Sequence, residues 1–494
     1  MFISQDDEKD LIKRQMSLSS LLQQIHQFTK DTKPVKLERP CSPADGIVVL
    51  NGSDCHRYQK LFETDGSRYS KMKFVPASGA ASRMFKHLHN YSPTSVSELA
   101  EEFIVNFDMF PFVSLIEKKM QEQELSLSHL LQTSQWDMIV DFILQPHGLN
   151  YNTQLKGMVV FHKYDNELRT AFEEHLLEAV RYGKQADGRC RIHFTISPQH
   201  IESVSKYLNE KINSYVFENI EVEFSTQNEN TDTIALDKNN EPVRDENGRL
   251  FFRPSGHGAL IQNLGQIDAD IIFIKNIDNV TTTARQEESV FYKQVLAGVL
   301  IELKSEVNRF MEMLTHGDDE LLEEALEFIQ LWFQPGLPLG MNTTQLKEYA
   351  HLRLDRPLRV CGMVRNEGEP GGGPFWVKMT GGYLSKQIVE KSQVDLHDLQ
   401  QSKILSSATH FNPVDIVCSI KNRDGVNYAL DQFIDYSTGF VSEKFHQGQV
   451  IKALEWPGLW NGAMALWNTV FVEVPVSTFN PVKTVNDLLR PGHQ

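Results

Sequence analysis

The chain of 494 residues contains only five cysteines, and none of them lies in a C-x-x-C pair. An odd number of scattered cysteines argues against a disulfide framework and against a zinc site. No apolar run reaches the ~20 residues that are needed to cross a bilayer, and the N-terminal sequence MFISQDDEKDLIKRQ has no apolar signal core. These absences predict a cytoplasmic protein that has no membrane partner.

Positive charge is also scarce, because 49 Lys and Arg residues are set against 65 Asp and Glu residues, which gives a net charge of −16. A nucleic-acid-binding protein needs a basic face, so we expect no nucleic-acid partner. A local basic pocket for a small phosphorylated ligand is still compatible with this composition. The motifs G-x-S-x-G, G-x-x-x-x-G-K-[ST] and H-E-x-x-H do not occur, so a nucleophile elbow, a Walker loop and a helical zinc site have no support.

The composition is that of an ordinary globular protein, with 40% hydrophobic and 23% charged residues. Strand-like runs such as CRIHFTIS, IEVEFST and DADIIFIKNID alternate with helical segments, and GMVVFH is a further strand of this kind. The alternation predicts an α/β fold with a Rossmann-like, mostly parallel sheet that is flanked by helices. Helices are also predicted over 5–30, 95–146 and 284–334, and a hairpin is predicted within 237–252.

The length favours two to three domains, or one large domain with insertions. We expect an N-terminal helical extension over residues 1–65 and a main domain over 66–400. The main domain is expected to carry a helical insertion at about 90–150, and residues 401–494 are expected to complete its site. The sequence carries no signal for an oligomeric state.

The segment KMKFVPASGAASRMFK combines a strand, a turn of small residues and a helix start. Backbone N–H groups at such a turn are unpaired and point outward, and the small residues Ala77, Ser78 and Gly79 let a phosphate approach them. Arg83 adds a planar fork that matches phosphate oxygens. The alternative is a tight turn with Arg83 in a surface ion pair, and the segment alone favours that alternative slightly.

Two further segments suggest ligand contacts. In RPSGHGAL, the glycines Gly256 and Gly258 surround His257 and allow a ligand to lie flat against the backbone. This G-x-G alone is weak evidence, and an ordinary loop is the alternative. The strand DADIIFIK ends at NIDN, and parallel sheets bind ligands beyond the carboxyl ends of their strands. Asp278 is therefore a suitable ligand for Mg²⁺, and an Asx turn or a helix cap is the alternative.

Three features of the C-terminal half are weaker. Lys483 follows a proline-stiffened turn in NPVKT. The glycine-rich run 362–376 fits either a ligand-contacting loop or a flexible hairpin tip. The Trp and Asn residues of 456–468 suit a sugar, and a Trp-rich core segment is an equal alternative.

Taken in order along the chain, these segments resemble the sugar-1-phosphate nucleotidyltransferases, especially the UDP-glucose and UDP-N-acetylhexosamine pyrophosphorylases. The resemblance extends over residues 74–489 with gaps. The similar segments are 77–83 (A-G-G-x-G-T-R in the family), 156–158 (a K-G-M-like segment with the activating lysine), 224–227 (F-x-x-Q), 254–258 (P-x-G-H-G), 276–279 (N-x-D-N), 387–390 (V-V-E) and 479–489 (P-V-K-T-x-x-D-L-L).

This resemblance implies a GT-A-like nucleotidyltransferase fold and a Mg²⁺-dependent reaction. A nucleoside triphosphate, with UTP preferred, would react with a sugar 1-phosphate and release pyrophosphate. The resemblance implies catalytic roles for Arg83, Lys156 and Lys483, and a metal-ligand role for Asp278. It also implicates Ala77, Ser78, Gly79, Gln227, Gly256, His257 and Gly258 in nucleotide binding, and Gly362, Glu390 and Asn468 in sugar binding.

The chain departs from the family pattern around the loop. Ser78 and Ala81 replace loop glycines, and a Cβ at either position is expected to restrict the approach of phosphate. The family keeps its loop Arg and its Lys close in sequence, whereas here they are 156 − 83 = 73 residues apart. The helical stretch 95–146 is therefore expected to be an insertion that folds away from the site.

These departures keep a second function open, that of a catalytically degenerate protein that binds nucleotide sugars in a binding or regulatory role. A glycosyltransferase is a third interpretation, because that class places D-x-D at its metal site and Asp268-x-Asp270 fits the letters. The pair stands at the start of a strand, which is the wrong end for a ligand, so this interpretation ranks last.

Overall fold

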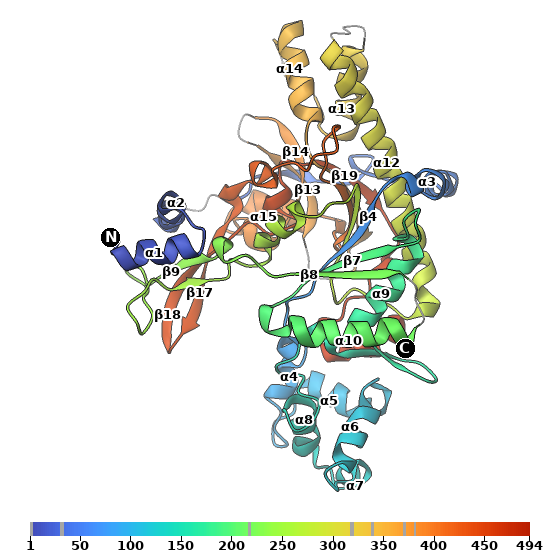
Figure 1. Ribbon diagram of the computed structural model, residues 1–494, viewed down its shortest axis with the longest axis vertical. Coiled ribbons are helices and arrows are strands. Elements are labelled where there is room, and N and C mark those ends of the chain that lie inside the picture. Colours follow the sequence, from blue (N-terminus) through green and yellow to red (C-terminus); the bar gives the residue numbers. More distant parts are fainter. Residues whose placement is uncertain are drawn as a thin grey trace. The chain divides into compact units, whose positions relative to one another are not determined.

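The computed structural model describes residues 3–29, 34–215, 219–316, 321–336, 340–368, 372–379 and 382–494 (Figure 1). The chain forms two compact units, and each is assembled from segments that lie far apart in the sequence. Unit 1 contains residues 1–70, 226–274 and 295–474, and unit 2 contains residues 71–225, 275–294 and 475–494. The boundaries expected near residues 65 and 400 both lie inside unit 1.

A mixed sheet forms the centre of unit 1, with the strand order β2-β3-β19-β12-β16-β11. β12 runs parallel to β19, with Leu358 opposite Asn468, and antiparallel to β16. Apolar runs such as Val470–Val472 are fully buried, which is typical of strands that are covered on both faces. The strands are β2 (Ser42–Pro43), β3 (Gly46–Val48), β11 (Ile271–Lys275), β12 (Leu358–Arg365), β16 (Asp415–Ser419) and β19 (Asn468–Glu473).

Two smaller antiparallel sheets complete unit 1. One has the order β1-β13-β14 and the other the order β10-β9-β18-β17. β10 returns antiparallel along β9, which confirms the hairpin predicted within 237–252. The strands are β1 (Leu37–Pro40), β9 (Thr233–Leu236), β10 (Phe252–Arg253), β13 (Gly373–Lys378), β14 (Leu384–Val389), β17 (Phe440–His446) and β18 (Gln449–Glu455), and β15 (His410–Phe411) pairs with β12.

The single helix predicted over 5–30 is wrong, because the chain forms α1 (Gln5–Lys13) and α2 (Leu18–Thr29) with a break between them. Gln15 takes the left-handed conformation with φ 54°, and the Met16 N–H donates to the Leu11 carbonyl at 2.9 Å, which closes the first helix. The break lets the apolar residues of both helices pack on the β9–β10 strands.

The longer helices of unit 1 are α3 (Gly52–Asp65), α13 (Leu322–Trp332), α14 (Thr343–Leu354) and α15 (Leu399–Ser406), with the short α11 (Ile261–Gly265). α12 (Gln286–His316) is the 31-residue helix that enters unit 1 at Val295. A Cβ on Gly298 would lie 2.0 Å from the Tyr58 carbonyl oxygen, so this glycine lets α12 and α3 cross closely. No helix of the described chain is long and apolar enough to cross a membrane.

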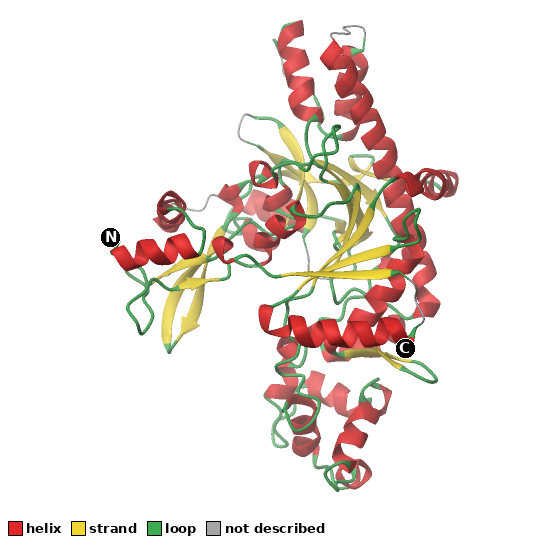
Figure 2. Cartoon of the chain, viewed as in Figure 1, coloured by secondary structure: helices red, strands yellow, loops and turns green. Residues whose placement is uncertain are grey.

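Unit 2 is built on the parallel strands β4 (Lys71–Pro76), β7 (Cys190–Thr195) and β8 (Ile220–Ser225). α9 (Ala171–Tyr182) packs against β7, and α10 (Ile201–Ser214) packs against α9 (Figure 2). These strands and helices alternate as the sequence predicts. Together with the parallel pairs of unit 1, they confirm the α/β fold with a mostly parallel sheet and flanking helices.

The segment GMVVFH is a strand but does not join the parallel sheet. It contains β5 (Val160–Lys163), which pairs antiparallel with β6 (Leu168–Thr170) in a separate two-stranded sheet. Only four residues separate the two strands, and a connection this short joins strands as a hairpin rather than as a parallel crossover.

Four short helices, α5 (Glu98–Val105), α6 (Val113–Gln121), α7 (Leu127–Gln132) and α8 (Trp136–Leu144), form the helical stretch of unit 2, preceded by α4 (Lys86–His89). Their buried residues belong to the same hydrophobic core as those of β7 and α9. Phe112 of this stretch lies with its ring centroid 6.4 Å from that of Phe85 and 5.6 Å from that of Tyr151. The helical stretch is therefore packed into unit 2.

Candidate functional site

The small-residue loop follows β4 and is exposed at Ser78, Gly79 and Ala80. Its first residue is fixed because the Ala77 N–H donates to the Thr195 carbonyl of β7 at 2.9 Å. Within the described chain, the N–H groups of the three exposed residues donate to no other residue. Open donors on an exposed turn are what a phosphate-binding loop requires.

Ala81 departs from the expectation for the loop, and Arg83 departs from the alternative of a surface ion pair. Ala81 is fully buried and belongs to the core of unit 2, so its Cβ does not occupy the exposed side of the loop, contrary to expectation. Arg83 is exposed and forms no hydrogen bond or ion pair with another residue of the described chain. Its guanidinium is therefore available to an anion.

Lys156 lies beside the loop even though it stands 73 positions after Arg83 in the sequence. Ala80 and Leu155 form an antiparallel bridge, in which the Ala81 N–H donates to the Gln154 carbonyl and the Lys156 N–H donates to the Gly79 carbonyl, both at 2.9 Å. The helical stretch between Arg83 and Lys156 therefore begins and ends beside the same bridge.

Gly157 is required by packing. A Cβ at this position would lie 2.5 Å from Cε2 of Phe172. Phe172 is fully buried and packs edge-to-face on Phe194 with ring centroids 4.9 Å apart. The glycine therefore lets the Lys156 backbone run directly over the core of unit 2.

Asp278 is the centre of the charged group. Its Oδ2 accepts hydrogen bonds from the Lys156 Nζ at 2.7 Å and from the Lys483 Nζ at 3.0 Å. Asp278 is only 7% exposed, and its Oδ1 is buried without a hydrogen-bond partner in the described chain. Buried carboxylate oxygens are normally paired, so the free Oδ1 is a position for a cation or a donor that belongs to a ligand.

The charges of the three groups affect one another. Burial alone raises the pKa of the Asp278 carboxyl, but the charges of Lys156 and Lys483 outweigh burial and hold that pKa below its ordinary value. Burial lowers the pKa of Lys156, against the opposing charge of Asp278. Two ammonium groups and one carboxylate leave a net positive charge, which favours an anionic ligand.

Lys483 is brought to Asp278 by the segment after Pro475. Asn279 and Pro481 form an antiparallel bridge, and the Val482 N–H donates to the Asp278 carbonyl at 3.1 Å. Asp487 then accepts the N–H groups of Lys483 and Thr484 at 2.8 and 2.7 Å. The resemblance includes Asp487 only as one letter of a motif, although its capping-box spacing from Thr484 indicates this role.

A buried network holds the strand end that carries Asp278. His175 of α9 places its Nε2 3.2 Å from the carbonyl oxygens of both Asn276 and Ile277. One turn further along α9, Glu178 contacts Lys275 at 3.0 Å and Lys73 at 3.6 Å. Burial lowers the pKa of Lys73 to about 7, against the opposing charge of Glu178.

No group of three or more His, Cys, Asp or Glu residues that could hold a metal ion occurs in the described chain. The donor set is therefore the single carboxylate of Asp278 with its unpaired Oδ1. That set fits Mg²⁺, because Mg²⁺ is commonly held by one or two carboxylates together with substrate phosphates and water. It does not fit a metal that needs a complete protein cage.

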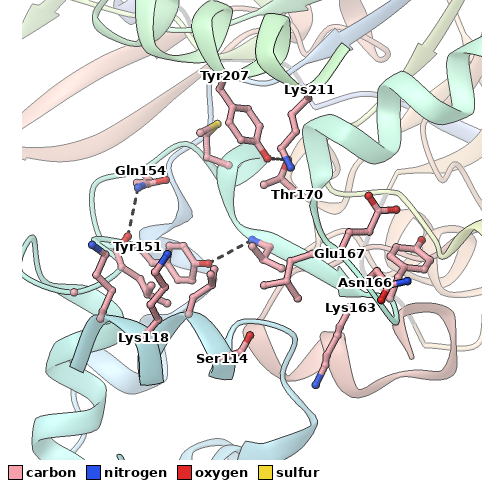
Figure 3. Close-up of a pocket in the computed structure, with 18 of the residues that line it drawn as sticks. Ser114, Lys118, Tyr151, Gln154, Lys163, Asn166, Glu167, Thr170, Tyr207 and Lys211 are labelled. Carbon is pink, nitrogen blue, oxygen red and sulfur yellow. Dashed lines mark hydrogen bonds between the residues drawn. The ribbon is translucent and has the colours of Figure 1, made fainter. Parts of the chain in front are cut away.

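The segment before Lys156 also lines a pocket of about 850 Å³ within unit 2. Figure 3 shows Tyr207 and Lys211 of α10 on one side of it and Lys118 and Ser114 of α6 on the other. The Gln154 side chain lines it as well, while its carbonyl holds the loop. The pocket is thus a separate cavity that shares one segment with the charged group.

In unit 1, the structure brings together two motifs that are about 200 residues apart in the sequence. The Trp456 N–H donates to the Ser255 carbonyl at 2.9 Å, and His257 stacks on Trp460 with ring centroids 4.6 Å apart. A Cβ on Gly258 would lie 2.0 Å from the Pro457 carbonyl oxygen, and Gly256 has φ 87°. Both glycines are therefore required by this junction.

The remaining candidate residues of unit 1 lie at different places. Glu390 follows β14. Burial lowers the pKa of His257, and the negative charges of Glu390 and Glu455 oppose that shift. Gln227 donates within its own turn to Thr231 at 3.1 Å.

Gly362 lies within β12, where a Cβ would lie 3.2 Å from a Val474 methyl group. Asn468 of β19 pairs with Leu358, which lies four positions before Gly362 on β12, and its side chain donates to the Arg353 carbonyl at 2.9 Å. Glu390 is thus near His257, whereas Gly362 and Asn468 lie within the central strands. Of the glycine-rich run 362–376, residues 369–371 lie outside the described residues.

The comparisons with known proteins concern the family and the fold. The family model described as "Domain of unknown function (DUF4301)" matches residues 4–494. No sequence among the curated proteins matches the chain. The structure is similar to that of the uridine diphosphate N-acetylglucosamine pyrophosphorylase from Trypanosoma brucei, with a TM-score of 0.51 and 12% identity, over 99% of this chain and 79% of that chain.

Two other solved structures are less similar. The UDP-glucose pyrophosphorylase from Leishmania major has a TM-score of 0.47 and 13% identity, over 99% of this chain and 78% of that chain. The UDP-glucose phosphorylase from Trypanosoma brucei has a TM-score of 0.45 and 14% identity, over 98% and 77%. At such identities the likeness concerns the fold alone.

Proposed function

The chain belongs to the DUF4301 family, and from its site we propose that it is a nucleotidyltransferase that joins a nucleoside triphosphate, UTP by preference, to a sugar 1-phosphate. The products are a nucleotide sugar and pyrophosphate. The observation that carries the proposal is the group around Asp278, in which two lysines share one carboxylate oxygen and the other oxygen is unpaired. This group adjoins a loop whose N–H groups and Arg83 are open to an anion.

The reaction is an in-line displacement at the α-phosphorus. An oxygen of the sugar phosphate forms the new bond to that phosphorus, and the bond between the α-phosphorus and the oxygen that bridges to the β-phosphorus breaks, so pyrophosphate leaves with the bonding electrons. No covalent enzyme intermediate is needed, and catalysis rests on positioning and charge neutralisation. The chain supplies both through lysines and backbone donors.

Each candidate residue of the charged group and of the loop has a proposed role in this reaction. Arg83 and the N–H groups of 78–80 hold the β- and γ-phosphates. Lys156 stabilises the charge that grows on the α-phosphate, and Lys483 holds the sugar phosphate. In the free protein both ammonium groups are bound to Asp278, and we propose that phosphate oxygens replace the carboxylate as their partner. Mg²⁺, held by Asp278, would neutralise the phosphates of both reactants.

Recognition of the base and the sugar is proposed for the remaining residues that the resemblance implicates. Gln227, Gly256, His257 and Gly258 are proposed to read the base, and the stacked His257–Trp460 pair offers an aromatic face. Glu390, whose charge opposes the lowering of the His257 pKa by burial, is proposed to accept a sugar hydroxyl, as the resemblance implies. Gly362 and Asn468 remain candidates for the sugar side.

The alternative is a protein of the same fold that binds nucleotide sugars without turning them over. It is favoured by Ser78, which stands exposed where the resemblance expects a loop glycine. Binding of UTP without release of pyrophosphate would establish this alternative.

The test is a pyrophosphate-release assay with Mg²⁺, a panel of nucleoside triphosphates and a panel of sugar 1-phosphates. We expect release with one pair of substrates, and loss of about 10²–10³-fold in rate with Lys156→Ala, the range seen when one charge-stabilising donor is removed. Lys206→Ala, an exposed lysine of α10, is the matched control and keeps full activity. A folded protein that releases no pyrophosphate from any pair would refute the transferase proposal.

A further inference from the structure

Two arginines in unit 1, one buried and one partly buried, have no carboxylate partner in the part of the chain that the structure describes. Arg353 stands near the end of α14 and is 5% exposed, and Arg356 follows one turn later and is partly buried. No Asp or Glu of the described chain forms an ion pair with either one, and the adjacent Asp355 accepts instead from the Tyr428 hydroxyl at 2.8 Å. Charges that are taken out of water normally have a partner, so this pair lacks its counter-ion.

The donors of Arg353 are unused. Its side chain forms no hydrogen bond within the described chain, and its Nε is buried without a partner. Its nearest aromatic contact is Tyr383, with the guanidinium carbon 5.9 Å from the ring centroid. Burial, together with the charge of Arg356, lowers the pKa of Arg353 to about 10. Arg356 is itself oriented, because it donates to the carbonyls of Leu352 and Leu466 at 2.9 and 3.1 Å.

Both arginines line a pocket of about 500 Å³, a size that suits a small molecule. The pocket lies beside α14, which packs against α13 (Figure 1). Tyr349 also lines it, and its hydroxyl is buried without a hydrogen-bond partner in the described chain. Tyr383 completes this side and interacts with Arg356 through its hydroxyl. Two guanidinium groups and two phenols thus converge on one cavity, and none of these four side chains is a carboxylate.

We propose that this pocket binds the dianionic phosphate group of a small molecule. Two adjacent guanidinium groups match the charge of a phosphate dianion, and their planar forks match its oxygens. The Tyr349 hydroxyl can donate to a third oxygen. A monocarboxylate would neutralise only one of the two arginines. All residues of the pocket belong to unit 1, whereas the charged group around Asp278 belongs to unit 2.

The test measures binding by the full chain with isothermal titration calorimetry and thermal denaturation. The probes are inorganic phosphate and glycerol 1-phosphate, with chloride at the same ionic strength as the reference. We expect a saturable increase in Tm of at least about 2 °C with phosphate compared with chloride. Tighter binding of glycerol 1-phosphate would assign the site to a phosphate ester, and equal or weaker binding would assign it to free phosphate. An equal Tm in phosphate and chloride would overturn the proposal.

The Arg353→Met variant keeps the length of the side chain and removes its charge. We expect at least a tenfold loss of affinity for phosphate, together with a Tm in phosphate-free buffer that equals or exceeds that of the wild type, because an unneutralised buried charge has been removed. A purely structural arginine would give the opposite pair of results, a lower Tm and unchanged phosphate affinity.

Two further variants keep the test decisive. Tyr349→Phe removes only a hydroxyl that has no partner in the described chain, so it should fold even if Arg353→Met does not, and it should weaken phosphate binding severalfold. Arg249→Gln removes an exposed arginine of unit 1 that is paired with Asp245, and it should leave phosphate affinity unchanged. Equal affinity in Tyr349→Phe and the wild type would overturn the assignment. A loss in Arg249→Gln as large as that in Tyr349→Phe would also overturn it, because the effect would then reflect net charge.

Discussion

The substitution Gly157→Ala tests whether the packing under the Lys156 segment is as tight as the structure indicates. The added Cβ would lie 2.5 Å from Cε2 and 2.7 Å from Cδ2 and Cζ of Phe172, whereas carbon atoms in contact are normally separated by about 3.5–4.0 Å. The ring or the backbone must therefore move by about 1 Å. Phe172 is fully buried and held edge-to-face by Phe194, so it cannot turn outward, and overpacking of this kind costs about 1–3 kcal/mol.

The measurement is guanidinium chloride unfolding of the wild type and of Gly157→Ala, Phe172→Leu and the double variant. We expect a loss of about 2–3 kcal/mol for the alanine variant. The smaller leucine side chain relieves the contact, so the double variant should be more stable than the sum of the single effects by more than about 1 kcal/mol. An alanine variant within about 0.5 kcal/mol of the wild type, or strict additivity, would refute the reasoning.

Three other predictions concern the charged group and the loop. Asp278→Asn leaves Lys156 buried opposite Lys483 without a counter-ion, and should lower the free energy of unfolding by about 3 kcal/mol in chemical denaturation; an unchanged free energy would show that the ion pairs contribute nothing. Because the folded-state pKa of Asp278 is lowered, its contribution is present at neutral pH and is lost as the pH falls through that pKa, so the stability difference between wild type and Asp278→Asn should shrink below about pH 4 in acid titrations followed by circular dichroism; a difference that grows towards acid would contradict this sign. Gly79→Ala places a Cβ that meets no atom within 4 Å, so stability should change by less than about 1 kcal/mol, while calorimetric affinity for UTP should fall about tenfold; unchanged affinity would place the phosphates elsewhere.

The sequence predicted the parallel strands of unit 2 well, because CRIHFTIS and IEVEFST carry local apolar signals of the right length. The charged group was accessible only through the resemblance, since Lys156, Asp278 and Lys483 lie in three distant segments and no local pattern joins them. Their meeting depends on the bridges Ala80–Leu155 and Asn279–Pro481, which are long-range pairings.

Other features had no usable signal. The break at Gln15 replaces one amphipathic helix by two, and both interpretations share the same apolar periodicity. The burial of Arg353 depends on residues that are distant in the sequence, since Tyr383 lies against its guanidinium and the Asn468 side chain donates to its carbonyl. Ala81 could not be assigned to the core or the loop surface, because a small residue fits either.

The bridge between Ala80 and Leu155 has a consequence for the energetics of ligand binding. A flexible glycine-rich loop loses conformational entropy when it closes on a ligand, and that loss weakens affinity. Here the loop is clamped before any ligand arrives, on one side by the Thr195 carbonyl and on the other by the bridge, and Ala81 is anchored in the core. The entropy is lost during folding, so a ligand would meet a pre-organised backbone. Ala81, which stands where the resemblance expects a glycine, contributes to this rigidity, whereas the glycines of a mobile loop let the loop adapt to its ligand.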